Sequence, residues 1–350
     1  MRFNYEGDLL FTSGLDGAVN LWYAESGERI GSFEGHRGAV YCVDVTRDSR
    51  FLLTASADNT VKLWEATTGK CLATVKHHGP CHGVAWAEGE REFAVIVNKF
   101  MAEAAALLVY TFNAEAPEEL SAAKPRLVFR DEGGPPADPK CVAWMPMNEG
   151  VMVGFDNGVL LQVDPDTGAE MGRWTEAHSE RITSLTFNEA KTLMLTSSKD
   201  KTVVLWDVKE MAEQRRFVTD LPVNAARLSP LREHLILGGG QEARDVTTTA
   251  AAAGKFETRF FDLVMGRELG RVKGHFGPIN TVDFSPDGWR FASGSETGNV
   301  ILYKLDPDYL VLGEDDNLDD PQLTEALEDG TYEKLLEEEQ EEKARGQGRG

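Results

Sequence analysis

Residues 35–65 read GHRGAVYCVDVTRDSRFLLTASADNTVKLWE, and residues 177–207 repeat them in altered form as AHSERITSLTFNEAKTLMLTSSKDKTVVLWD. In both copies a histidine is followed, at identical gaps of 20, 2 and 6 residues, by a serine, an aspartate and a tryptophan. A third unit, GHFGPINTVDFSPDG at 274–288, repeats only the first gap. The residues of the pattern are His36, Ser56, Asp58 and Trp64, then His178, Ser198, Asp200 and Trp206, and finally His275 and Ser295.

This spacing predicts a chain of hydrogen bonds in each unit. Imidazole, hydroxyl, carboxylate and indole N–H groups can act as successive donors and acceptors. We expect the aspartate to orient the histidine, the histidine to bond the serine, and the serine to meet the tryptophan. The same residue types also occur in hydrolase triads, but an active site does not recur two or three times in one chain. The recurrence therefore favours a structural role.

Short apolar runs, most of them ending in an aromatic residue, recur along the chain in steps from the low forties to the mid fifties. Such a period with four short strands per unit is typical of the blades of WD-repeat propellers. We therefore predict an all-β fold, a seven-bladed WD-repeat β-propeller over residues 1–309. The seven runs are NLWY (20–23), VKLW (61–64), LLVYTF (107–112), VLLQV (159–163), VVLW (203–206), TRFF (258–261) and VILY (300–303).

The first blade is expected to be truncated. Gly14, Asp16 and Trp22 stand at the right offsets, but no Gly-His unit precedes them and only FNY remains of a first strand. Most closed propellers take the outer strand of the last blade from the start of the chain, which leaves no open edge. That strand is missing here. Either the sequence is shortened at its amino terminus, or DPDYLVLG at 306–313 fills the gap.

Three further segments interrupt the pattern. Residues 111–140 are rich in proline, alanine and charge, and we expect one strand, LVF, between two surface loops. Gln241–Gly254 is long enough to be a functional or disordered loop, and no lysine follows its glycines at P-loop spacing. KHHGPCHGVAW holds four residues of zinc-binding type, but it stands where other blades carry their Gly-His unit. We expect one histidine of this segment to belong to a network, and no metal site.

Composition narrows the functional classes. The net charge is −22, and residues 314–350 hold 14 acidic against 4 basic residues, so this tail carries −10 and the rest −12. We expect residues 310–350 to be an acidic, partly helical or disordered tail. An acidic body disfavours direct binding of nucleic acid. There is no signal peptide or long apolar run, and four cysteines without a CxxC pair indicate reduced thiols, which together favour a cytoplasmic protein without membrane association.

Part of the sequence resembles a known family. The stretch 222–249, PVNAARLSPLREHLILGGGQEARDVTTT, together with GKFETRFF and GRVKGHFGPINTVDFSPDG, is similar to the sixth and seventh blades of the i subunit of eukaryotic translation initiation factor three. YEGDLLFT, GAVYCVD and SADNTVKLWEATTGK resemble its first two blades, whereas the middle blades match loosely. Members of the family begin with a strand and a Gly-His unit upstream and end near the last blade, so the acidic tail has no counterpart.

The resemblance implies a non-catalytic scaffold without cofactors. It holds the b and g subunits of the factor, which acts on the small ribosomal subunit. A helical segment of b lies against the outer side of the propeller, and a segment of g winds along it. By resemblance, blades five and six supply two acids for a basic partner and three phenylalanines for apolar contacts. These candidates are Asp207, Asp220, Phe256, Phe260 and Phe276.

Two other functions compete with this one. The first is a different adaptor, in signalling or ubiquitin ligation, because propellers serve many partners. The segment 222–288 argues for the translation factor, since a generic adaptor has no reason to carry it. The second is a propeller enzyme. That function needs catalytic groups or a metal that converge at the central channel, and we find no unrepeated constellation of this kind in the sequence.

Overall fold

The computed structural model describes residues 1–240 and 256–311. The chain divides into two units, Met1–Lys304 and Leu305–Gly350. The first unit consists of strands with two short 3-10 helices among its described residues, and the described part of the second holds the 3-10 helix η5 (Pro307–Val311). The predictions for the loop 241–254 and for residues 312–350 of the tail fall outside the described residues. No described helix is long and apolar enough to cross a membrane.

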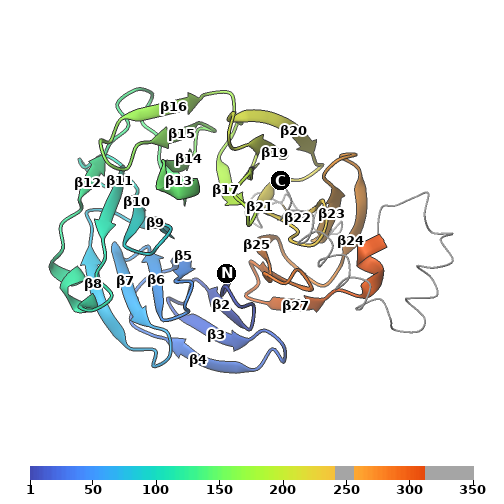
Figure 1. Cartoon of the computed structure of the whole chain (residues 1–350), viewed down its shortest axis with the longest axis horizontal. Helices are drawn as coiled ribbons and strands as arrows, with labels where there is room; N and C mark the ends of the chain where they lie inside the picture. The colour runs from blue at the N-terminus through green and yellow to red at the C-terminus, as the bar shows by residue number, and fades with distance from the viewer. Residues whose placement is uncertain (241–255, 312–350) are drawn as a thin grey trace, which may run out of the picture. The chain divides into compact units, whose positions relative to one another are not determined.

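Seven antiparallel sheets form the first unit, which confirms the predicted seven-bladed β-propeller (Figure 1). Within each blade the strands follow one another in sequence from the inner to the outer edge. The strands are β1 (Arg2–Phe3), β2 (Leu9–Ser13), β3 (Val19–Tyr23) and β4 (Arg29–Phe33) in blade one; β5 (Val40–Val45), β6 (Phe51–Ser56), β7 (Thr60–Glu65) and β8 (Cys71–Lys76) in blade two; β9 (Cys81–Trp86), β10 (Glu92–Val97), β11 (Ala106–Thr111) and β12 (Leu127–Phe129) in blade three; β13 (Pro139–Trp144), β14 (Val151–Phe155), β15 (Leu160–Val163) and β16 (Glu170–Trp174) in blade four; β17 (Ile182–Phe187), β18 (Leu193–Ser198), β19 (Thr202–Asp207) and β20 (Ala212–Val218) in blade five; β21 (Val223–Leu228), β22 (His234–Gly239), β23 (Thr258–Asp262) and β24 (Glu268–Val272) in blade six; and β25 (Ile279–Phe284), β26 (Arg290–Ser295) and β27 (Val300–Lys304) in blade seven.

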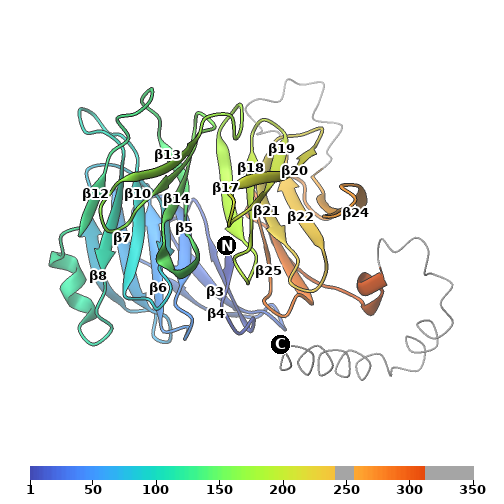
Figure 2. The same ribbon diagram turned by 45° about the horizontal axis from the view of Figure 1, so that its top comes forward.

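The core lies between neighbouring blades. All six residues of β6 are buried, and β14 is buried at all five of its positions. A strand that is packed on both faces needs such a continuous apolar run rather than an alternating one. Figure 2 shows the strands of each blade running between the two rims of the ring. The loops that join the strands therefore gather on two surfaces, which can present side chains to partners.

Blade one has four strands, of which β1 has two residues, and its truncation stays a prediction. Arg2 pairs with Phe11 and Phe3 with Leu10. The strand that is absent from the described residues is the outer strand of blade seven, which has three. The described part of DPDYLVLG does not fill this place, because it forms η5. Pro307 begins that helix, and proline lacks the N–H group that a sheet edge requires.

The ring closes between blade seven and blade one at its inner strands. The backbone N–H of Phe3 donates to Asp283 Oδ2 on β25 at 3.0 Å. Asp283 is itself 6% exposed and is paired with Arg227 Nε at 2.6 Å. A buried carboxylate with both a guanidinium and an amide as partners is well satisfied. This contact joins blades one, six and seven at the ring centre.

The interrupted segment of blade three contains the predicted LVF strand, β12, which pairs with β11. The sequence analysis missed the 3-10 helix η1 (Pro117–Ala122) in the same segment. Its Pro117 occupies the first turn, where the missing N–H costs nothing, and Leu120 is buried in the core of blades two and three. The sequence signal for this helix was Leu120, a large apolar residue in a charged stretch.

Candidate functional site

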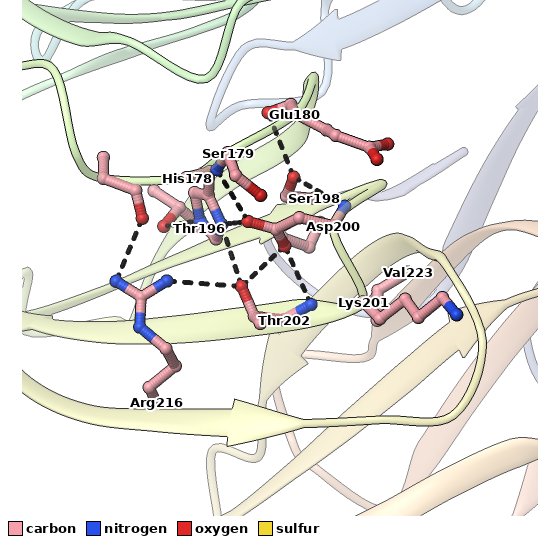
Figure 3. A network of polar contacts seen from close by, with 12 residues as sticks. His178, Ser179, Glu180, Thr196, Ser198, Asp200, Lys201, Thr202, Arg216 and Val223 are labelled. Carbon is pink, nitrogen blue, oxygen red and sulfur yellow. Dashed lines mark hydrogen bonds and ion pairs between the residues drawn. The ribbon is translucent and has the colours of Figure 1, made fainter.

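The repeated network is seen most completely in blade five (Figure 3). His178 Nδ1 lies 3.0 Å from Asp200 Oδ2, and His178 Nε2 lies 2.9 Å from Thr196 Oγ1. Trp206 Nε1 donates to the same Thr196 oxygen at 2.9 Å. The hydroxyl of Thr202 donates to Asp200 Oδ1 at 2.6 Å. These side chains therefore tie the loop before the blade to its second and third strands.

Blade two repeats these contacts. His36 Nδ1 is 2.9 Å from Asp58 Oδ2, and His36 Nε2 is 2.6 Å from Thr54 Oγ1. Trp64 Nε1 donates to Thr54 Oγ1 at 2.9 Å. Burial lowers the pKa of His36, although the Asp58 carboxylate opposes it. Burial works against a lower pKa for Asp58, but hydrogen bonds from Thr60, the Arg37 amide and His36 bring it down to about 2. A neutral histidine thus donates to an ionised aspartate.

The prediction that Ser56 and Ser198 bond the histidine and the tryptophan of their units is wrong. Ser198 Oγ donates to the carbonyl of Glu180 and accepts from the Asp200 amide, each at 3.1 Å, and Ser56 does the same with Gly38 and Asp58. Trp206 pairs with Met194, so Thr196 is its diagonal neighbour on the same face and Ser198 lies one step further. The indole therefore reaches the threonine first.

A repeated signal could have identified the correct hydroxyl. It stands 18 residues after the histidine in all three units, as Thr54, Thr196 and Ser293. In blade seven the Nε2 of His275 lies 2.6 Å from Ser293 Oγ, whereas Ser295 bonds Thr297 Oγ1 at 2.7 Å. The threonine replaces the aspartate, and the buried Nδ1 of His275 has no hydrogen-bond partner among the described residues.

Restoring the carboxylate in blade seven is expected to stabilise the chain. Thr297→Asp would give His275 Nδ1 the acceptor that His36 and His178 have, and one satisfied buried group contributes about 1 kcal/mol. Urea denaturation of the variant should therefore show a higher free energy of unfolding. Thr297→Asn, which lacks the charge, is the matched control with a smaller gain. A loss of stability in the aspartate variant would contradict this account.

His77 and His82 of KHHGPCHGVAW have different neighbours. His77 contacts the Tyr110 ring edge-on at 5.9 Å, much as His36 contacts Trp64 at 6.1 Å, so it resembles the network histidines in its packing. Its Nε2 nevertheless has no partner in the described part of the chain. His82 stacks on Tyr41 instead, with ring centroids 4.2 Å apart. The described residues contain no group of three or more side chains that could hold a metal ion.

The rim at which the outer strand of one blade connects to the inner strand of the next is called here the histidine rim. His36, His178 and His275 all lie on it. Of the five partner-binding candidates, Asp220, Phe256 and Phe276 also lie on this rim. Their loops meet at Gly240, whose N–H donates to the carbonyl of Pro222 at 3.0 Å and whose added Cβ would lie 3.1 Å from Phe256 and 3.2 Å from Pro278.

The other two candidates lie elsewhere. Asp207 ends β19 on the opposite rim, where its Oδ1 accepts from the Glu210 amide at 2.9 Å. Phe260 is 4% exposed, and its ring packs edge-on against Phe291 at 5.4 Å. The prediction that Phe260 contacts a partner is therefore corrected, because its position on β23 directs the ring into the core between blades six and seven.

Asp220 is already engaged within the chain. It forms an ion pair with Arg259 Nη2, while its side chain remains 51% exposed. Partial burial works against ionisation, but the positive charge of Arg259 lowers the pKa of Asp220. Arg259 also lies 3.9 Å from Glu268, which pairs with Arg271. A change at Asp220 thus affects a small network on blade six as well as any partner.

Seven antiparallel blades, two of which contain the full network of histidine, threonine, aspartate and tryptophan side chains, define a WD-repeat β-propeller. The crystal structure of the Cps50 (Swd1) β-propeller domain of Myceliophteria thermophila has the same fold. Its TM-score is 0.72 at 17% identity, and the match covers 87% of this chain and 96% of that one.

The chain belongs to the family of subunit I of eukaryotic translation initiation factor 3. The family model EIF3I matches residues 1–315. Subunit I of Homo sapiens is 40% identical, and those of Taeniopygia guttata and Mus musculus are 41% identical, each over 88% of this chain and 93% of the relative. The resemblance found in the sequence is confirmed, and the chain is a non-catalytic subunit of a translation initiation factor.

Proposed function

We propose that this chain is a rigid scaffold that holds the b and g subunits of translation initiation factor 3. In this role the assembled complex acts on the small ribosomal subunit in the cytoplasm. The chain itself makes no direct contact with nucleic acid, because its net charge of −22 repels phosphate backbones. Membership of the subunit I family supports the proposal, and the geometry of blades five and six indicates how a partner segment could be held.

The observation that carries the proposal is the separation of Asp207 and Asp220. They lie at opposite ends of the β19–β20 hairpin, with β20 as the exposed outer strand of blade five. At a rise of about 3.3 Å per residue, the two acids are roughly 20 Å apart. A helix rises 1.5 Å per residue, so about 13 helical residues would span this distance. A basic helix of the b subunit would therefore meet one acid near each of its ends.

Apolar contacts at the histidine rim complete this surface. Phe276 is 86% exposed, and Phe256 is half-buried beside Gly240. An exposed aromatic ring gains free energy when a partner covers it. The two rings continue the surface from Asp220 over blade six towards blade seven. An extended segment of the g subunit, or the end of the b helix, could cover them.

Reversing both charges is expected to weaken the binding of the b subunit by about tenfold. The variant Asp207→Lys with Asp220→Lys removes one attraction at each end of the hairpin and replaces it with repulsion. Biolayer interferometry with the immobilised carboxy-terminal segment of the b subunit would measure the dissociation constant. A thermal melt of the double variant, in which the Arg259 pair is also lost, would verify that the propeller is folded.

The matched control is Glu34→Lys with Glu65→Lys. Glu65 ends β7 in blade two as Asp207 ends β19 in blade five, and Glu34 lies in a loop of the histidine rim. The net change of charge is the same in both double variants. The control should bind the b subunit as the unaltered chain does. The proposed surface on blades five and six would be wrong if both double variants weakened binding equally, or if neither weakened it.

A further inference from the structure

Six blades carry a β-bulge at the same place, near the start of the inner strand. In each of them one residue of the inner strand is skipped in its pairing with the second strand. A bulge leaves the extra residue outside the ladder and re-aims its side chain. The skipped residues are Tyr41 on β5, His82 on β9, Lys140 on β13, Thr183 on β17, Asn224 on β21 and Asn280 on β25.

These bulges form a ring of their own. The inner strands β5, β9, β13, β17, β21 and β25 surround the centre of the propeller (Figure 1), and each follows directly on a loop of the histidine rim. Bulges at one register therefore bring six side chains together around the ring axis on that rim. We call these six residues the bulge ring.

Contacts link five of the six members of the bulge ring in two groups. Tyr41 stacks on His82 with an interplanar angle of 5°. Asn98 accepts both from His82 Nε2 at 3.2 Å and from Lys140 Nζ at 3.0 Å, in the amide orientation that satisfies all its bonds. Further round, Asn224 Nδ2 donates to Asn280 Oδ1 at 3.1 Å. The side chains are thus held in place by their neighbours before any partner arrives.

The part of the ring formed by blades three to five brings several charged side chains together. Burial and the charges of Lys140 and Arg181 lower the pKa of His82 to about 4. Burial lowers the pKa of Lys140, the charges of Asp138 and Asp156 oppose this change, and those of Arg181 and Lys99 add to it more weakly. Asp138 lies 3.8 Å from Lys140, and its Oδ1 accepts from the Lys99 amide at 3.0 Å. Lys140 is thus neutralised within the chain, whereas Arg181 and Lys99 remain beside it.

Two of these cations are available to a partner. Arg181 and Lys99 are exposed, and neither side chain has an ion pair or hydrogen bond within the described ranges 1–240 and 256–311. Beside them, Tyr41 is 46% exposed and offers a flat aromatic face.

We propose that Tyr41 and His82 of the bulge ring, with the flanking Lys99 and Arg181, bind an acidic peptide segment of a partner protein on the histidine rim. Carboxylates of the peptide pair with Arg181 and Lys99, while an apolar or aromatic residue lies on Tyr41. This site lies on the side of blades two to five, away from Asp220 and Phe276. It therefore operates independently of the proposed binding of the b and g subunits.

A short acidic peptide fits this site better than a nucleic acid. The cations occupy one small area and do not form the extended basic stripe that follows a phosphate backbone. Beyond that area the acidic body would repel the rest of a long polyanion. A short peptide can place a few carboxylates on the cations without extending over the acidic surface. Electrostatic contacts of this kind weaken as salt rises.

The test uses the full chain and a fluorescein-labelled octaglutamate, with binding followed by fluorescence anisotropy at low salt. The double variant Arg181→Glu with Lys99→Glu is expected to weaken binding by about tenfold, because two exposed attractions become repulsions. Lys209→Glu with Lys191→Glu provides the same change of charge on the opposite rim, at the ends of blade-five strands. This control should change the dissociation constant less than twofold.

Three outcomes would overturn the proposal. The first is the absence of saturable octaglutamate binding by the unaltered chain. The second is equal weakening by the control variant, which would indicate attraction by overall charge. The third is tighter binding of an eight-nucleotide single-stranded oligothymidylate than of octaglutamate, lost in the same double variant, which would identify a nucleic-acid site. Thermal melts of both variants distinguish loss of binding from loss of fold.

Discussion

Thr196→Val is expected to lower the free energy of unfolding by about 3 kcal/mol, more than Ser198→Ala, the removal of the serine hydroxyl two residues away. Valine keeps the shape of threonine but removes the hydroxyl that serves both His178 Nε2 and Trp206 Nε1. Thr196 is fully buried, so water cannot replace the lost partner. Each buried nitrogen left without a partner costs about 1–3 kcal/mol. Two such nitrogens explain the size of the effect.

Ser198→Ala is the matched comparison, because the sequence pattern assigned Ser198 the role that Thr196 has. The serine hydroxyl bonds only the Glu180 carbonyl and the Asp200 amide. Its removal should cost about 1 kcal/mol. Urea denaturation followed by circular dichroism would measure both variants. A larger loss for Ser198→Ala than for Thr196→Val would mean that the network does not depend on the threonine. Thr54→Val and Ser56→Ala provide an independent repeat in blade two.

The sequence was sufficient to predict the blade architecture but not the identity of every bonded atom. The seven recurring apolar runs correspond to β3, β7, β11, β15, β19, β23 and β27, the third strand of each blade. The gap of 20 residues led to the wrong hydroxyl, because Thr196 and Ser198 share one face of β18 and spacing alone does not distinguish them. The register of β19 on β18, with Trp206 opposite Met194, makes the distinction.

The candidate binding surfaces depended still more on structure. Three phenylalanines lie within 21 residues of one another, yet their environments differ. The ring of Phe260 is buried, that of Phe256 is half-buried and that of Phe276 is exposed. Only the strand pairing of β23 determines that Phe260 faces the core. The bulge ring could not be predicted from the sequence either, because a bulged residue has no local sequence pattern. The basic residues near it are separated by dozens of positions and meet only when the ring closes.

Mild acid is expected to destabilise the propeller well before its carboxylates are protonated. Burial, with the charge of His78, lowers the pKa of His77 to about 4, and burial with the charges of Lys140 and Arg181 lowers that of His82 to about 4. In the unfolded chain both histidines titrate near 6.5. Between pH 6.5 and 4 the unfolded state therefore binds more protons than the folded state. Stability is complete above pH 6.5 and falls as the pH is lowered through this window.

The expected loss at pH 4.5, relative to pH 7.5, is about 2 kcal/mol for each of the two histidines. Chemical denaturation at a series of pH values would measure it, and His77→Phe identifies its source. Phenylalanine fills the same space beside Tyr110 without a titrating nitrogen, so this variant should match the unaltered chain at pH 7.5 and lose about half as much at pH 4.5. Asp58, whose pKa is depressed to about 2, contributes in a separate window, since its stabilisation is lost only below about pH 4. A free energy of unfolding that stays constant from pH 7.5 to 5 would show that the two histidines are free to protonate in the folded state, and the packing described for both rings would then be wrong.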